Sequence, residues 1–195
     1  MAVEAAFYFD LRSPEAYLAA ERALSVLGAP CEWQPILAAA LPAAESFEAY
    51  RCERERDVMR ENVERRAAAL ALQPLRWPVP FPYDSRFAML TATYAKRLGK
   101  TVAFSLAAFR QAFAGGHALS EPDNVLIAAA ACEIHPAAIL KATQTRAIAA
   151  ALERASADAL ALGVSDVPAV RIGERVLVGE RSLEQAGALL AAARR

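Results

Sequence analysis

The pattern of apolar and polar positions along the chain begins with an apolar, aromatic run at residues 3–11, VEAAFYFDL, which is typical of a buried strand. A helix is predicted to follow. Ser13 suits its N-cap, Pro14 its first position and Gly28 its end. The apolar face of this helix is expected to consist of Tyr17, Ala20, Leu24 and Leu27.

The middle of the chain is predicted to be helical. A second strand is expected at 31–37, CEWQPIL, with Pro35 placing its end at a sheet edge. Beyond it the chain is rich in alanine to about residue 163. Helices are expected at 46–72, 87–98, 102–114, 122–133 and in two stretches between 136 and 162, which Thr145 separates. The proline-rich segment 72–85, LQPLRWPVPFPYDS, is predicted to be a loop.

The end of the chain changes to β-branched residues. Two runs, 169–172 and 175–178, predict a hairpin whose two-residue turn, Gly173-Glu174, has glycine first. Ser182 and Gln185 suggest a capping box for a last helix to about Ala193.

The resulting order is β-α-β, several helices, then β-β-α. Such a start and finish are the two halves of a thioredoxin-like sheet, so we predict an α/β, thioredoxin-like fold with a large all-helical insertion. Residues 1–37 and 164–195 would form the thioredoxin-like domain, and residues 38–163 the inserted helical subdomain.

Composition narrows the function classes. With 56% hydrophobic and 23% charged residues, the chain is expected to fold around a core. A net charge of zero argues against a nucleic-acid partner, and no apolar run is long enough to predict a membrane span. The start has no basic stretch followed by an apolar one, and the three cysteines are odd in number and far apart. We therefore expect a reduced, cytoplasmic protein, and with only two histidines no metal site.

The turn between the first strand and the first helix is the first candidate site. Thioredoxin-like redox proteins carry C-x-x-C at this turn, whereas this chain reads Ser13-Pro14-Glu15-Ala16, which excludes disulfide exchange at the turn by this chain alone. The start of a helix stabilises an anion, so the Ser13 hydroxyl could donate a hydrogen bond to the sulfur of a bound thiol. Alternatively, Ser13 is only an N-cap.

Two later segments would face this turn in such a fold. A cis Pro168 would lie across the site and leave the backbone N–H and C=O of Val167 free to pair with an extended peptide. The alternative is a trans proline at the start of an edge strand. Glu180 and Arg181 precede the last helix. They could hold an α-ammonium and an α-carboxylate group, or they could be an exposed pair in a turn.

Three stretches together carry a family resemblance: FYFDLRSPEAYLA (7–19), GVSDVPAV (163–170) and VLVGERSLEQ (176–185). They resemble the 2-hydroxychromene-2-carboxylate isomerases and the kappa-class glutathione transferases, in the DsbA-like branch of the thioredoxin superfamily. The resemblance implies a glutathione-dependent isomerase, commonly a homodimer, that acts on a small molecule. It assigns Ser13 to the glutathione sulfur, Val167 before cis Pro168 to the cysteinyl backbone, and Glu180 and Arg181 to the γ-glutamyl end.

The chain departs from the family pattern at several positions. Glu180 stands where aspartate is usual, Arg12 where small residues are common and Glu15 where an aromatic residue is frequent. The segment after the second strand, LAAALPAAES, lacks the asparagine often found there.

The proline-rich loop supplies candidates for a substrate pocket with aromatic walls and a cation for a carboxylate: Trp77, Phe81, Tyr83 and Arg86. These aromatic residues could equally pin the insertion to the core.

Three other functions stay open. They are a kappa-like glutathione S-transferase, a non-catalytic protein that binds a thiol or another ligand, and a thiol–disulfide oxidoreductase or chaperone, against which the absent C-x-x-C argues.

Overall fold

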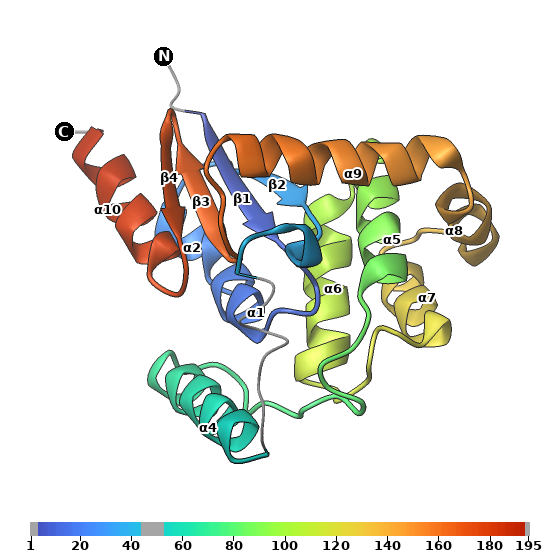
Figure 1. Cartoon of the computed structure of the whole chain (residues 1–195), viewed down its shortest axis with the longest axis horizontal. Coiled ribbons are helices and arrows are strands. Elements are labelled where there is room, and N and C mark those ends of the chain that lie inside the picture. Colours follow the sequence, from blue (N-terminus) through green and yellow to red (C-terminus); the bar gives the residue numbers. More distant parts are fainter. Residues whose placement is uncertain (1–3, 44–52, 194–195) are drawn as a thin grey trace.

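A four-stranded mixed sheet forms one half of the protein and a group of helices forms the other (Figure 1). The computed structural model describes residues 4–43 and 53–193. In chain order the elements are β1 (Ala5–Phe9), α1 (Pro14–Ala20), α2 (Ala23–Leu27), β2 (Glu32–Pro35), the 3₁₀ helix η1 (Ala38–Ala40), α4 (Glu53–Ala69), α5 (Arg86–Arg97), α6 (Thr101–Phe113), α7 (Pro122–Ala130), α8 (Pro136–Thr143), α9 (Arg146–Ala161), β3 (Ala169–Ile172), β4 (Arg175–Val178) and α10 (Ser182–Ala193).

The sheet has the strand order β2-β1-β3-β4. β1 is parallel to β2 and antiparallel to β3, and β3 and β4 form a hairpin. Gly173 occupies the first turn position of this hairpin with a φ of +58°, a backbone conformation that glycine adopts at little cost. The observed order of elements confirms the predicted thioredoxin-like fold with its helical insertion.

The two faces of the sheet are covered differently because side chains alternate along β1. Phe7 and Phe9 point toward α1, α2 and α6, whereas Ala6 and Tyr8 point toward α9. Figure 1 shows α9 crossing from the helical half to the sheet. No helix among residues 4–43 and 53–193 is long and apolar enough to cross a membrane.

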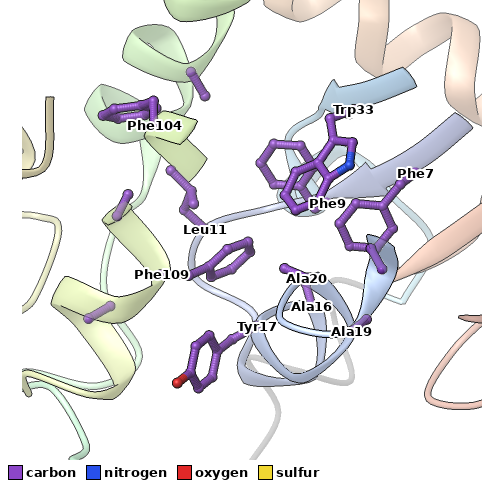
Figure 2. Close-up of a cluster of buried hydrophobic side chains, with 14 of the residues drawn as sticks. Phe7, Phe9, Leu11, Ala16, Tyr17, Ala19, Ala20, Trp33, Phe104 and Phe109 are labelled. Atoms are coloured by element: carbon purple, nitrogen blue, oxygen red, sulfur yellow. The ribbon is translucent and has the colours of Figure 1, made fainter. Parts of the chain in front are cut away.

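Aromatic rings make the core continuous between the two halves (Figure 2). The ring centroid of Phe9 lies 5.9 Å from that of Phe109 on α6, and Phe7 lies 4.9 Å from Trp33 on β2. Tyr17 of α1 stacks on Phe113 at 5.6 Å. The sheet and the insertion therefore share one apolar interior, while the division into two domains stays a prediction.

The first predicted helix is in fact two helices. Arg22 donates its backbone N–H to the carbonyl of Ala19, three residues back, and α2 starts at Ala23 in a new direction. The prediction that Leu24 lies on the buried face was wrong, because this break turns its side chain outward to 81% exposure. Of the predicted helix at 46–72, residues 46–52 lie outside the described residues, and the described part is α4.

The start of the last helix also differs from its predicted capping box. Ser182 is the first residue of α10 rather than the residue before it. Its hydroxyl donates to the carbonyl oxygen of Pro168 at 3.5 Å, so it connects the helix to the segment before β3.

Phe109→Ala is expected to lower the free energy of unfolding by about 3–5 kcal/mol, because the ring is fully buried between the two halves and its loss leaves a cavity. Urea denaturation would measure this. Leu24→Ala, at an exposed position, is the control and should change the stability by no more than about 0.5 kcal/mol. Equal effects of the two substitutions would contradict the shared core.

Candidate active site

Ser13 occupies the turn between β1 and α1, as the sequence predicts. Its Oγ accepts a hydrogen bond from the backbone N–H of Ala16 at 3.1 Å, and Pro14 is the first helical residue. Ser13 is therefore an N-cap, which is usually worth about 1 kcal/mol. This bond uses an oxygen lone pair only, so the hydroxyl hydrogen can still be donated to a ligand. The two sequence interpretations of Ser13 are thus compatible.

The segment just before Ser13 is held by the helical insertion. Leu11 donates its backbone N–H to the sulfur of Met89 on α5 at 3.2 Å, and its carbonyl oxygen accepts a hydrogen bond from the Tyr83 hydroxyl at 2.7 Å. Burial, together with the nearby carboxylate of Asp10, raises the pKa of Tyr83 well above its ordinary value, so Tyr83 stays a donor. The insertion therefore fixes the backbone that positions Ser13.

Asp10 is a buried carboxyl group directly behind the turn. It accepts hydrogen bonds from the backbone N–H groups of Arg12 at 3.0 Å and Ala38 at 2.9 Å, and from the Ser85 hydroxyl. Burial raises the pKa of Asp10, and these hydrogen bonds and the charge of Arg12 oppose the rise. Asp10 thus joins β1, η1 and the start of α5 at one point. Sequence reasoning missed it because it lies within an apolar run.

A second turn carries Val167 and Pro168. The Val167–Pro168 bond is cis, as the fold argument from the sequence anticipated. The expectation that the Val167 N–H would be free was wrong, because it donates to Oδ1 of the neighbouring Asp166 at 2.7 Å. The Pro168 carbonyl accepts the backbone N–H of Gly179 at 2.8 Å, which connects this turn to the one that carries Glu180.

A third turn carries Glu180 and Arg181, and Arg66 of α4 joins it to the first. The Arg66 guanidinium forms ion pairs with Glu15, two residues after Ser13, and with Glu180 at 2.9 Å. A cavity of about 250 Å³ lies here, lined by Arg66, Ala69, Leu70, Glu180, Arg181 and Glu184. Sequence reasoning did not select Arg66, since it is one of several arginines in a charged stretch and only the fold sets it apart.

The four residues predicted for a substrate pocket take three different positions. Trp77 and Phe81 contact each other with ring centroids 4.9 Å apart, and both contact Phe113. Tyr83 is buried on Leu11, as described above. Arg86 lies at the start of α5 and pairs with Glu153 of α9 at 3.1 Å. The aromatic residues therefore pin the loop to the core, and their role toward a substrate stays a prediction.

Comparison with known proteins identifies the family. A family model described as DSBA-like thioredoxin domain matches residues 5–191. The chain belongs to the DSBA-like thioredoxin family. No curated protein sequence matches it.

Three solved structures have the same fold at low sequence identity. A 2-hydroxychromene-2-carboxylate isomerase is 18% identical with a TM-score of 0.86, covering 98% of this chain and 96% of that one. A probable DsbA oxidoreductase from Streptomyces coelicolor is 17% identical with a TM-score of 0.80, covering 99% and 90%. A thioredoxin-like oxidoreductase from Silicibacter pomeroyi DSS-3 is 16% identical with a TM-score of 0.62, covering 98% and 86%. At these identities the likeness establishes the fold alone.

The described cysteines of this DSBA-like chain lie away from the turn. Burial and the neighbouring Glu32 raise the pKa of Cys31 to about 12, so its thiol stays protonated near neutral pH. Burial also raises the pKa of Cys132, which lies just after α7. Cys52 falls outside the described residues. Neither described thiol has the low pKa of a redox-active cysteine.

Several charged groups act on Glu15, which follows Ser13 by two residues. Burial raises the pKa of Glu15, Arg66 lowers it, and the charges of Glu180 and Asp166 raise it again. Burial also raises the pKa of Asp166, against the hydrogen bond from Val167. Three carboxyl groups, from Glu15, Asp166 and Glu180, thus interact near one arginine, Arg66. The site is suited to a ligand that brings positive charge or hydrogen-bond donors as well as an anionic group.

Asp10→Asn is expected to change how stability depends on pH. Because burial raises the Asp10 pKa in the folded state above the ordinary 3.8, the folded protein keeps a proton that the unfolded chain has lost. Between the ordinary pKa of 3.8 and the raised pKa of Asp10 in the folded state, the free energy of unfolding of the unaltered protein falls as pH rises. Asp10 contributes at most about 1.4 kcal/mol per pH unit to this fall.

The measurement is urea denaturation from pH 4 to pH 7 at constant ionic strength, for the unaltered protein and Asp10→Asn. The stability of the unaltered protein relative to the variant should decline as pH rises. Asp57→Asn, at an exposed position on α4, controls for the loss of one charge. A difference that stays constant across this range would show that the pKa of Asp10 is not raised.

Proposed function

We propose that this protein is a glutathione-dependent isomerase of the 2-hydroxychromene-2-carboxylate isomerase type, acting on an aromatic or unsaturated small molecule. The observation that carries the proposal is the Ser13 N-cap, whose oxygen is used by Ala16 while its hydrogen can be donated. Support comes from the family resemblance of the three turns and from the similarity of fold to an isomerase of this name.

The residues present fit a bound glutathione in the character of their groups. The cavity beside the Ser13 turn carries two guanidinium groups, Arg66 and Arg181, and two carboxylates, Glu180 and Glu184. This mixture suits the α-carboxylate and α-ammonium groups at a γ-glutamyl end. The Arg66–Glu180 ion pair is partly exposed and therefore weak. A charged group of a ligand can replace either partner of this pair at a small cost in free energy.

Bound glutathione would supply a thiol nucleophile, which the described side chains around Ser13 do not include. The chain's residues would prepare that thiol. The Ser13 hydroxyl donates a hydrogen bond toward the sulfur, and the start of α1 adds a positive potential, so both favour the thiolate over the thiol. The Leu11 contacts with Met89 and Tyr83 keep this donor in place.

The neighbouring residues have defined parts in the same proposal. Arg181 pairs with the γ-glutamyl carboxylate and Glu180 with its ammonium group. Val167 pairs with the cysteinyl backbone once its N–H leaves the Asp166 carboxylate. Trp77 and Phe81 form an apolar wall for a flat substrate.

The alternative with the same residues is a kappa-like glutathione S-transferase. Both reactions need the thiolate at Ser13, and they differ in whether the thiol is released unchanged or stays attached to the product. Product analysis distinguishes them. Turnover of a cis-trans or ring-opening substrate without consumption of glutathione identifies an isomerase, whereas stoichiometric loss of glutathione with an aryl halide identifies a transferase.

Ser13→Ala and Ser13→Gly together test the serine. Both variants lose the hydroxyl, but glycine keeps most of the N-cap stability whereas alanine loses about 1 kcal/mol. If Ser13 anchors the sulfur, calorimetric titration with glutathione at pH 7–9 should give roughly tenfold weaker binding in both variants, which corresponds to about 1.4 kcal/mol.

Thermal unfolding of the same variants, followed without ligand, separates binding from stability. Ser25→Ala, at an exposed position on α2, is the control and should bind as the unaltered protein does. A Ser13→Gly variant that binds glutathione normally would make Ser13 a cap alone. Absence of glutathione binding to the unaltered protein would refute the assignment and leave a non-catalytic or different ligand-binding role.

A further inference from the structure

A second and larger cavity lies between β2, α5 and α9. Its volume is about 460 Å³, within the range of small-molecule sites. Figure 1 shows α9 passing beside α5 and the end of β2 at this place. The cavity is separate from the Ser13 site. Ser85, which donates a hydrogen bond to Asp10 behind the Ser13 turn, lies just before the first turn of α5. Lys96, which lines the second cavity, lies in the last turn of α5, roughly 16 Å further along the helix axis.

The hollow arises from the sequence of α9. Ala151, Ala155 and Ala159 follow each other at intervals of four, so they lie along one face of the helix and their short side chains leave space. Tyr8 of β1 and Thr93 of α5 lie at the buried side of this space. The cavity thus offers an apolar wall beside two hydroxyl groups.

Three basic side chains line the cavity, and two of them are held in place. The Lys96 ammonium donates to the side-chain oxygens of Gln34 and Glu32. Arg97 donates to the carbonyl oxygen of Ala147 at 2.9 Å, and its guanidinium forms no ion pair with a carboxylate in the described part of the chain. A planar guanidinium fixed at a cavity wall is ready to bind a carboxylate.

Arg154 and Asp158 face the cavity from α9, one turn apart. Neither side chain forms a hydrogen bond or ion pair with another of residues 4–43 and 53–193. The cavity lining therefore carries three basic groups against one acidic group, and Glu32 pairs with Lys96 at its edge. The remaining positive charge attracts an anion, while Asp158 can accept a hydrogen bond from a donor on the same ligand.

We infer that this cavity binds a small organic 2-hydroxy carboxylate. Its carboxylate pairs with Arg154 and Arg97, its hydroxyl donates to Asp158, and its hydrocarbon part lies against the alanine face of α9. A phosphate ion fits less well, because its two negative charges would be repelled by Asp158 and it has no apolar part for the alanines.

The test is a titration of the ¹⁵N-labelled full chain, followed by NMR, with 2-hydroxy-4-methylpentanoate at constant ionic strength. Saturable shifts are expected at the amides of Gln34 and Ala155 and not around Ser13. The matched probe 4-methylpentanoate, which lacks the hydroxyl, should bind several-fold more weakly, and inorganic phosphate should bind more weakly still.

Three variants assign the contacts. Arg154→Gln should weaken binding of the hydroxy acid roughly tenfold, as expected for loss of a charge-assisted pair. Asp158→Asn should reduce the difference between the hydroxy acid and its matched probe. Arg146→Gln, an exposed position on the same helix outside the cavity, is the control and should bind normally.

The inference is overturned if no shift saturates, if the shifts centre on Ser13, or if Arg146→Gln weakens binding as much as Arg154→Gln. Stronger binding of phosphate than of either carboxylate would refute the ligand class. Because none of these outcomes depends on glutathione, the failure of this inference and the failure of the proposed enzymatic function can be told apart.

Discussion

The hydrogen bonds to the Leu11 backbone are the constraint on which the rest of the site depends. β1 ends at Phe9, and only a short segment separates it from α1. No strand within residues 4–43 and 53–193 pairs with that segment, so its polar groups need other partners. Met89 and Tyr83 supply them for Leu11, and the Asp10 carboxyl supplies one for Arg12. The helical insertion therefore helps to position Ser13, whether or not it also forms a substrate pocket.

Local chemistry made part of this arrangement predictable from sequence. Ser13 followed by proline indicates a helix start, Gly173 indicates a tight hairpin, and Thr145 indicates a new helix, and each is found there. Capping and turn residues act on the backbone within a few positions of themselves, so their effect does not depend on contacts with distant parts of the fold. The apolar pattern also placed most helices within a few residues of their observed ends.

Features that depend on contacts between distant elements could not be read in the same way. No proline or glycine marks the break between α1 and α2 in the sequence, so Leu24 looked like a core residue. Arg66 gains its place only because α4 lies against the Ser13 and Glu180 turns at once. Sequence periodicity carries no information on such encounters.

The core that runs from Phe7 and Phe9 to Phe109 limits how far the chain can be divided into independent parts. An inserted subdomain with its own interior could unfold or be removed while the sheet remained intact. Here its removal would leave Phe9 and Tyr17 without the α6 rings that cover them. The insertion and the sheet are therefore expected to unfold together in one cooperative step, and a substitution in either half is expected to change the stability of both.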